Sequence, residues 1–306
     1  MKNVYKYIGL GVGIAVLLIV ALCLTRREEL VIANVAKHYS LLYESNLELE
    51  TVVYSTHKKS KYFDLDNIEN CKIISTDETQ IVQLKEIKME EQTVSMNEHD
   101  FYPVILRLQF SYIPENKCVL DDAKLEIVYK TNEKLNVKLG NICFLKVSKN
   151  KDFLINSVSS IVNDFGKMES LAALVIDLEN ISDKEYEIIT IEPISNTIKT
   201  NYDYVKIFDD DAEFNNDVLI NDVVGETFDS YKQSKNKELH LKINKNFRKV
   251  IVLPLTYEKK ELVDSLGFVI TYKEEEEIKQ QIINPYRLFN TTNNEFVYYE
   301  YEITGN

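Results

Sequence analysis

The hydrophobic pattern of the chain changes from one continuous apolar run near the start to strict alternation further on. Ile8 to Leu24 contains no charged residue. As a helix with a rise of about 1.5 Å per residue, it would extend roughly 26 Å, close to the ~30 Å hydrocarbon core of a bilayer. Arg26 and Arg27 follow the run, where their side chains can reach the headgroups. The pattern predicts a transmembrane anchor and a short cytoplasmic tail within residues 1–25.

Two other interpretations of this run stay open. Lys2 and Lys6 give a positively charged start, as in a cleaved signal peptide, but the run is longer than the ~7–15 apolar residues of a signal core. Cys23 would be the acylated residue of a lipoprotein, although Leu22 stands where that signal has a small residue. The length fits a retained anchor best, and we place the rest of the chain outside the cytoplasm.

The segment after the run keeps a helical spacing. Apolar side chains recur every three or four positions, at Val31, Val35, Tyr39 and Leu42. No glycine or proline interrupts them. This spacing is typical of an amphipathic helix. We predict a juxtamembrane helix over residues 26–45, which continues the membrane helix or packs on the first domain.

From about residue 46 the apolar period changes to two. Leu106, Leu108 and Phe110 face one way while the polar residues between them face the other, as in a half-buried strand. Similar stretches recur to the end of the chain at ~8–12-residue spacing, separated by polar turns, which is typical of a β-sandwich. The polar residues 131–133 predict the turn of a hairpin.

The alternation fades over residues 149–167, where serine and asparagine become more frequent and a short helix is one interpretation. We predict a linker here. It would separate a first β-rich domain, residues 46–148, from a second, antiparallel β-sandwich domain, residues 168–306. We expect both domains to be antiparallel β-sandwiches of immunoglobulin-like type.

The second domain opens with an alternating stretch, residues 171–179, then a polar turn at residues 180–184 and a second alternating stretch from Tyr186. We predict a hairpin here. The arrangement resembles immunoglobulin-like domains of bacterial surface proteins over about twenty residues, without their Cys–Trp–Cys hallmark. The resemblance implies an immunoglobulin-like architecture, not membership of a family.

The composition is that of a folded, acidic protein. Hydrophobic residues make up 45% and charged residues 28% of the 306 positions, which are values of globular domains. The 49 acidic residues exceed the 36 basic residues and give a net charge of −13. Binding to nucleic acid needs clustered lysine and arginine to neutralise phosphates. The charge therefore argues against a nucleic-acid partner.

The cysteine pattern contains no metal or redox motif, because no two cysteines stand in a C-x-x-C spacing. A hairpin with its turn at residues 131–133 would bring Cys118 and Cys143 within about three residues of facing each other. Outside the cytoplasm this pair is a candidate disulfide. The alternative is a pair of buried free thiols, because free cysteine is a common small core residue.

A cluster of oxygen-bearing side chains gives a second candidate site. Its acidic members are Asp209, Asp211, Glu213 and Asp217. Calcium takes six to eight oxygen ligands, and loops between strands can supply them. The EF-hand pattern fails, since Phe214 stands where glycine is required. The alternative is an exposed acidic loop.

The sequence shows no catalytic or phosphate-binding motif, such as G-x-S-x-G or H-E-x-x-H. We predict a non-catalytic single-pass membrane protein, without a cofactor, whose extracytoplasmic β-domains bind or scaffold a protein partner at the bacterial cell envelope. An envelope hydrolase with a loop-assembled site and an accessory binding subunit of a membrane transport complex are the alternatives. Gly9 and Gly13 form a G-x-x-x-G pair that would support a homodimer.

Overall fold

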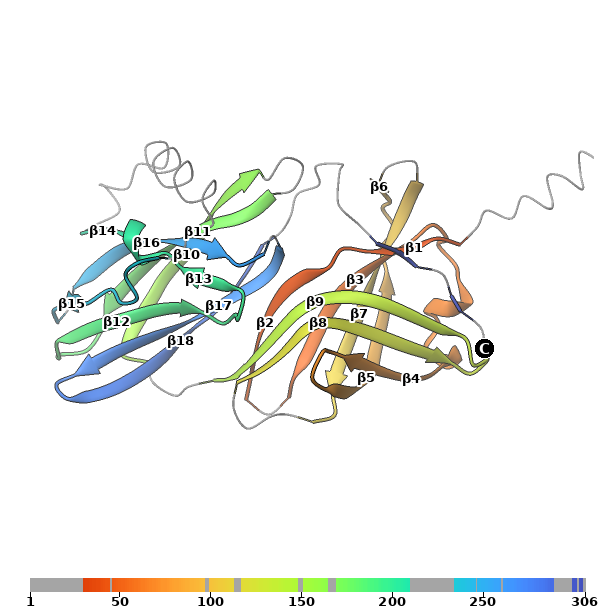
Figure 1. Cartoon of the computed structure of the whole chain (residues 1–306), viewed down its shortest axis with the longest axis horizontal. Helices are drawn as coiled ribbons and strands as arrows, with labels where there is room; N and C mark the ends of the chain where they lie inside the picture. The colour runs from red at the N-terminus through yellow and green to blue at the C-terminus, as the bar shows by residue number, and fades with distance from the viewer. Residues whose placement is uncertain are drawn as a thin grey trace, which may run out of the picture.

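The protein forms two β-rich lobes that lie side by side along its long axis (Figure 1). The computed structural model describes residues 30–44, 46–96, 99–112, 117–147, 151–164, 169–209, 234–245, 247–259, 261–288, 299–301 and 303–304. Across these ranges, no helix has the length and apolar character needed to cross a bilayer. The predicted anchor, Ile8 to Leu24, lies outside the described residues.

The first lobe contains the strands from the start of the chain and one from its end. They are β1 (Ile32–Asn34), β2 (Lys37–Tyr43), β3 (Glu48–Ser55), β4 (Ile68–Ile74), β5 (Thr79–Met89), β6 (Val94–Met96), β7 (His99–Phe110), β8 (Cys118–Tyr129), β9 (Lys134–Lys146) and β19 (Tyr299–Tyr301), with the short 3-10 turns η1 (Lys61–Phe63) and η2 (Leu65–Asn67).

The second lobe contains the strands between these. They are β10 (Phe153–Asp164), β11 (Glu169–Asn180), β12 (Tyr186–Pro193), β13 (Ile198–Thr200), β14 (Lys206–Phe208), β15 (Leu241–Ile243), β16 (Arg248–Tyr257), β17 (Leu262–Glu274) and β18 (Glu277–Arg287), with the 3-10 turn η3 (Tyr202–Tyr204).

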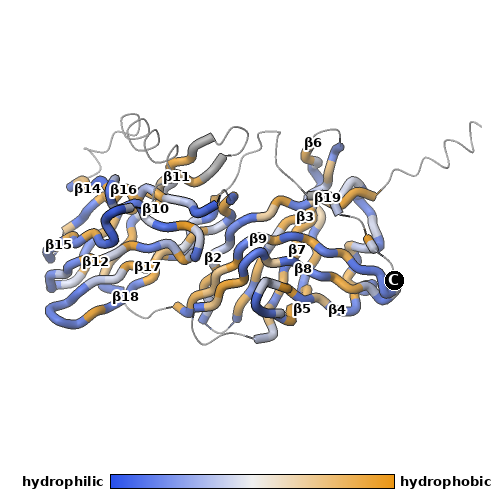
Figure 2. Tube along the Cα trace, in the orientation of Figure 1, coloured by the Kyte–Doolittle hydropathy of each residue, from blue (hydrophilic) through white to orange (hydrophobic). Residues whose placement is uncertain are grey.

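The first lobe is an antiparallel sheet that curls until its two ends meet. Its strands follow the order β9-β8-β4-β5-β7-β3-β1-β19. Just after β19, Thr304 exchanges backbone hydrogen bonds of 2.8 and 3.0 Å with Lys134 at the start of β9. The alternating residues Leu106, Leu108 and Phe110 point into the enclosed core, as their spacing predicts. Figure 2 shows the same alternation of apolar and polar positions along the strands of both lobes.

The second lobe is a two-layer β-sandwich, which confirms the predicted architecture for this part of the chain. One layer has the order β10-β11-β16-β13, with β14 also paired to β16. In the other layer β17 lies between β12 and β18, and β15 extends the edge beyond β12. Buried residues from both layers, including Leu174, Ile191 and Phe268, form the core between them.

The turn at residues 131–133 is confirmed, but the hairpin predicted at residues 180–184 is wrong. β8 and β9 pair directly around Asn132, whose φ is +64°. In contrast, β11 pairs with β10 and β16, while β12 pairs with β15 and β17 in the opposite layer. The buried Asn180 side chain donates hydrogen bonds of 2.7 Å to Lys184 O and 3.0 Å to Asn244 O, and so holds a crossing between layers.

The predicted juxtamembrane helix is also wrong where the structure describes it, because β1 and β2 occupy this segment. β2 runs parallel to β9, from Lys37 opposite Gly140 to Tyr43 opposite Lys146. Its other edge runs parallel to the first residues of β17. The helical spacing is misleading here because His38, Ser40 and Tyr39 are all at most 2% exposed, so both faces of the strand are buried. β2 thereby joins the two lobes in one hydrogen-bonded sheet.

The elements also cross the predicted domain limits. Residues 153–164, within the predicted linker, form β10 and not a short helix. Residues 299–301, within the predicted second domain, form β19 and pair with β1 of the first lobe. The two buried cores are nevertheless distinct, one inside each lobe.

Replacing Gly140 by alanine is expected to lower the free energy of unfolding by about 2–5 kcal/mol. Gly140 has φ +105°, and a Cβ there would lie 2.2 Å from the backbone oxygen of Lys37 in β2. Urea denaturation of the full chain in non-ionic detergent measures the change. The matched control is Gly267→Ala, whose Cβ would meet the movable end of the Ile194 side chain at 2.8 Å. An equal loss from both variants would contradict a special role for Gly140 in the contact with β2.

Candidate functional site

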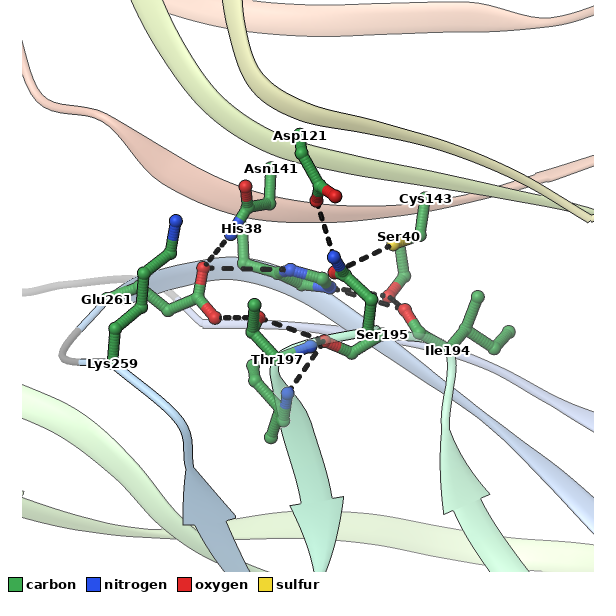
Figure 3. Close-up of polar contacts among 12 residues, drawn as sticks. His38, Ser40, Asp121, Asn141, Cys143, Ile194, Ser195, Thr197, Lys259 and Glu261 are labelled. Carbon is green, nitrogen blue, oxygen red and sulfur yellow. Dashed lines mark hydrogen bonds and ion pairs between the residues drawn. The ribbon is translucent and has the colours of Figure 1, made fainter. Parts of the chain in front are cut away.

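A buried group of polar side chains lies where β2 meets the second lobe (Figure 3). We call it the interlobe polar cluster. Its members come from β2, from β9, from the connection between β12 and β13, and from the residue before β17, and they are His38, Ser40, Asn141, Ser195, Thr197 and Glu261. The strand pairing of β2 with both β9 and β17 brings these distant segments together.

His38 and Ser40 project from the same face of β2, because successive side chains of a strand alternate. The Nε2 atom of His38 lies 3.2 Å from the backbone oxygen of Ile194, and the Ser40 hydroxyl donates to the same oxygen at 2.9 Å. Nε2 therefore carries the proton, since a carbonyl can only accept. The other ring nitrogen, Nδ1, is buried without a hydrogen bond and lies 4.0 Å from a carboxylate oxygen of Glu261.

The Glu261 carboxylate is held by donors from both lobes. Asn141 of β9 donates to one of its oxygens at 2.6 Å, and the Thr197 hydroxyl of the second lobe donates to the other. The Asn141 side-chain oxygen in turn accepts the backbone N–H of Asp122 at 3.1 Å. Burial raises the pKa of Glu261, and the hydrogen bonds from Thr197 and Asn141 oppose that rise. Glu261 thus links three segments through one side chain.

Burial lowers the pKa of His38 to about 4, because the charged imidazolium would lose its hydration. The hydrogen bond to Ile194 opposes this shift, and the positive charge of Lys117 adds to it. His38 is therefore neutral at neutral pH.

Ser40, His38 and Glu261 are the residue types of a nucleophile, a base and an orienting carboxylate. Ser40 Oγ lies 3.4 Å from His38 Nε2. However, that nitrogen is protonated and directed at Ile194 O, so it is not free to accept the serine proton. The serine hydroxyl is likewise donated to Ile194 O, and Ser40 is 1% exposed. These contacts make the cluster a structural junction between the lobes.

Further polar contacts surround the cluster and cross the same junction. Ser265 Oγ accepts the backbone N–H of Ser40 and donates to its backbone oxygen, both at 3.2 Å. Lys37 pairs with Asp264 at 3.2 Å. Because each contact joins a residue of β2 to a residue of β17, together they fix the position of one lobe against the other.

The predicted calcium ligands are only partly within the described residues. Asp209 is described, and its carboxylate pairs with Lys249. Asp211, Glu213 and Asp217 lie outside the described residues. Throughout the portion that the structure describes, no three histidine, cysteine, aspartate or glutamate side chains are grouped to hold a metal ion.

Cys118 and Cys143, the candidate disulfide pair, are both free thiols, in line with the alternative interpretation. In the β8–β9 pair Cys118 lies opposite Phe144, and Cys143 lies opposite Val119. Neighbouring cross-strand positions project to opposite faces of a sheet, so the two thiols are separated by it. The Cys118 thiol instead donates to Glu78 at 3.1 Å.

Sequence reasoning missed the interlobe polar cluster. His38 was assigned to a helix, and neither Ser40 nor Glu261 stands in a motif. The one available signal is the spacing of His38 and Ser40, two polar residues that share a face only if the segment is a strand.

Comparison with known proteins does not place the chain in a family. No family model matches it, and no curated protein matches its sequence. Among solved structures, the C-terminal domain of the antigen I/II polypeptide BspA of Streptococcus agalactiae has 11% identity, covering 84% of this chain and 99% of that chain, with a TM-score of 0.20. The C-terminal domain of the antigen I/II-family protein AspA of Streptococcus pyogenes has 10% identity, the same coverage and a TM-score of 0.21.

A chicken TCR matches with 8% identity, covering 82% of this chain and 98% of that chain, with a TM-score of 0.19. TM-scores this low carry no argument about fold or function. The architecture described above rests on the strands and their pairing alone.

Acid is expected to destabilise the chain through His38. Its pKa is lowered in the folded state, so its contribution is complete above the unfolded value of 6.5 and is lost as the pH falls towards 4. The full loss is about 3 kcal/mol. Glu261 acts with the opposite sign, because its raised pKa favours the protonated, folded form in acid. His38→Gln keeps a donor for Ile194 O and removes only the His38 part of the pH dependence, measured by urea denaturation between pH 7 and pH 4.

The control for this experiment is His240→Gln, since His240 is exposed and is paired with Glu187 and Glu238. The pKa of His240 is raised by these carboxylates, so its substitution is expected to change the pH profile in the opposite direction. If His38→Gln leaves the profile of the original chain unchanged, the buried junction does not contain a titrating histidine.

The three described cysteines are expected to react as free thiols. Burial raises the pKa of Cys71, Cys118 and Cys143 to about 12, so iodoacetamide should label them slowly in the native chain at pH 8. In denaturant without reductant all three should be labelled, as read by mass spectrometry of the peptides. A cross-linked peptide pair containing Cys118 and Cys143 would contradict the register of β8 and β9.

Proposed function

We propose that the chain is a non-catalytic binding or scaffolding protein, held in a membrane by Ile8 to Leu24, with its β-rich bulk outside the cytoplasm. The apolar run supports the anchor, since its length fits a bilayer. The observation that carries the binding role is the union of both lobes in one sheet through β2. This shared sheet keeps the two lobes, and the surfaces that each lobe exposes, in a fixed relative orientation.

The position at which the chain joins the first lobe indicates how the two lobes would be oriented relative to the membrane. Strand β1, which directly follows Leu30 and Val31 in the chain, lies in the part of the first lobe that is remote from the second lobe (Figure 1). Val31 is fixed there by hydrogen bonds of 3.0 and 3.1 Å with Thr56. At no more than about 3.6 Å per residue, the chain from Leu24 to Leu30 reaches at most roughly 20 Å. An anchor at Ile8 to Leu24 would therefore keep the first lobe near the membrane and present the second lobe away from it.

The chemistry of the interlobe polar cluster supports a binding role over hydrolysis. Its only serine–histidine pair, among the residues that Figure 3 draws, donates both protons to Ile194 O and is closed to solvent. The acidic surface, with a net charge of −13, favours a protein partner over nucleic acid. A homodimer through Gly9 and Gly13 is the specific alternative to a different protein partner.

Labelling of intact cells tests the topology. A membrane-impermeant amine reagent is expected to modify exposed lysines such as Lys59 and Lys235 in intact spheroplasts, because the bulk lies outside. Peptide mass spectrometry reads the modification, and lysed spheroplasts give the reference. Labelling of these lysines only after lysis would overturn the external location.

Deletion of residues 8–24 provides the matched variant for the anchor. The shortened chain is expected in the soluble fraction, while the original chain sediments with membranes. Cross-linking in native membranes, followed by identification of the linked peptides, then distinguishes a second copy of this chain from another protein. Sedimentation of the shortened chain with membranes would contradict anchoring through this run.

A further inference from the structure

A polar cavity of about 990 Å³ opens beside the interlobe polar cluster, on the second lobe. Its walls come from the connection between β12 and β13, from the end of β16, from η3, from residues 234–237 and from Lys117 of the first lobe. Cavities of ~300–1,000 Å³ are the size that small-molecule ligands occupy.

Three lysines from three separate segments line the cavity. Lys117 precedes β8, Lys199 lies in β13, and Lys237 lies in the segment before β15. The ammonium group of Lys117 is positioned by a 3.3 Å hydrogen bond to the backbone oxygen of Ser195. Lys199 and Lys237 are exposed and form no ion pair among the described residues. Within that part of the chain, the ammonium groups of Lys199 and Lys237 have no acidic partner, whereas that of Lys117 is hydrogen-bonded to Ser195.

The carboxylates of the cavity do not cancel this charge. Glu192 and Glu258 are its acidic members. One oxygen of Glu192 accepts the Tyr202 hydroxyl at 2.7 Å, so this carboxylate is already hydrogen-bonded within the wall. Among the described lining residues, three lysines stand against two glutamates, so this part of the wall is positive in a chain whose net charge is −13. A positively charged concave site concentrates anionic ligands near it.

We propose that this cavity binds a small ligand carrying two or more anionic groups, phosphate or carboxylate. Ammonium groups form short, charge-assisted hydrogen bonds to both kinds of oxygen. Lys199 and Lys237 supply these bonds, and Lys117 brings the first lobe into contact with the same ligand. This binding would not require Ile8 to Leu24 to span a membrane.

Equilibrium dialysis of the full chain in non-ionic detergent tests the proposal. The probes are radiolabelled pyrophosphate, citrate and the neutral sugar sucrose, each at low ionic strength. We expect saturable binding of pyrophosphate or citrate with a dissociation constant below about 1 mM. The stronger of the two identifies phosphate or carboxylate as the preferred group. Added salt should weaken the binding, because it screens exposed charges.

The double variant Lys199→Gln with Lys237→Gln is expected to weaken anion binding by about tenfold or more, since two charge-assisted hydrogen bonds are lost. Both side chains are exposed, so the fold should persist, as circular dichroism would verify. The matched control is Lys242→Gln with Lys245→Gln, which removes the same charge from exposed positions outside the cavity.

Three outcomes would overturn the proposal. The first is absence of saturable binding of either anion at millimolar concentration. The second is an equal loss of affinity in the control variant, which would make the binding a general effect of surface charge. The third is binding of sucrose with undiminished affinity in the double variant, which would assign the cavity to a neutral ligand.

Discussion

The parallel insertion of β2 between β9 and β17 is the contact on which the rest of the structure depends. Among the described strands, the pairing of β2 with β17 is the one that joins a strand of the first lobe to a strand of the second, and it unites two separate cores in one body. The insertion requires a close approach of backbones, which the glycine at position 140 permits. A half-buried strand directs its polar side chains to solvent, but a strand that is buried on both faces has no face exposed to solvent. The polar residues on β2 must therefore find partners inside the protein.

The interlobe polar cluster meets that requirement. Burying a polar group without a hydrogen bond costs more than the bond itself contributes. The hydrogen bonds of the cluster across the two lobes therefore favour this arrangement of the lobes. Its one unsatisfied atom, Nδ1 of His38, lies beside the Glu261 carboxylate and makes the junction sensitive to protonation. The cluster contains the residue types of a hydrolytic triad, but here their contacts hold one lobe against the other.

The sequence predicted the strands well and their partners poorly. Alternation identifies which residues of a strand face a core, as at Leu106 and Leu108, because that property is local. It does not identify which strand lies alongside, so residues 180–184 looked like a hairpin although they cross between layers. β2 was mistaken for a helix because burial on both faces removes the alternation. The interlobe polar cluster could not be predicted from the sequence, because its residues lie far apart in the chain and only strand pairing brings them together.

The return of β19 to the first lobe has a consequence for how the chain is made. Ile32 pairs with Tyr301, and Lys134 with Thr304, so the first lobe closes only with residues that follow the whole second lobe in the chain. A ribosome delivers the beginning of the chain long before its end. The edges of β1 and β9 that pair with residues 299–304 therefore remain unpaired until the whole second lobe has been synthesised. The first lobe is therefore completed by residues that follow the second lobe in the chain, and loss of residues 299–304 would damage the lobe that was made first.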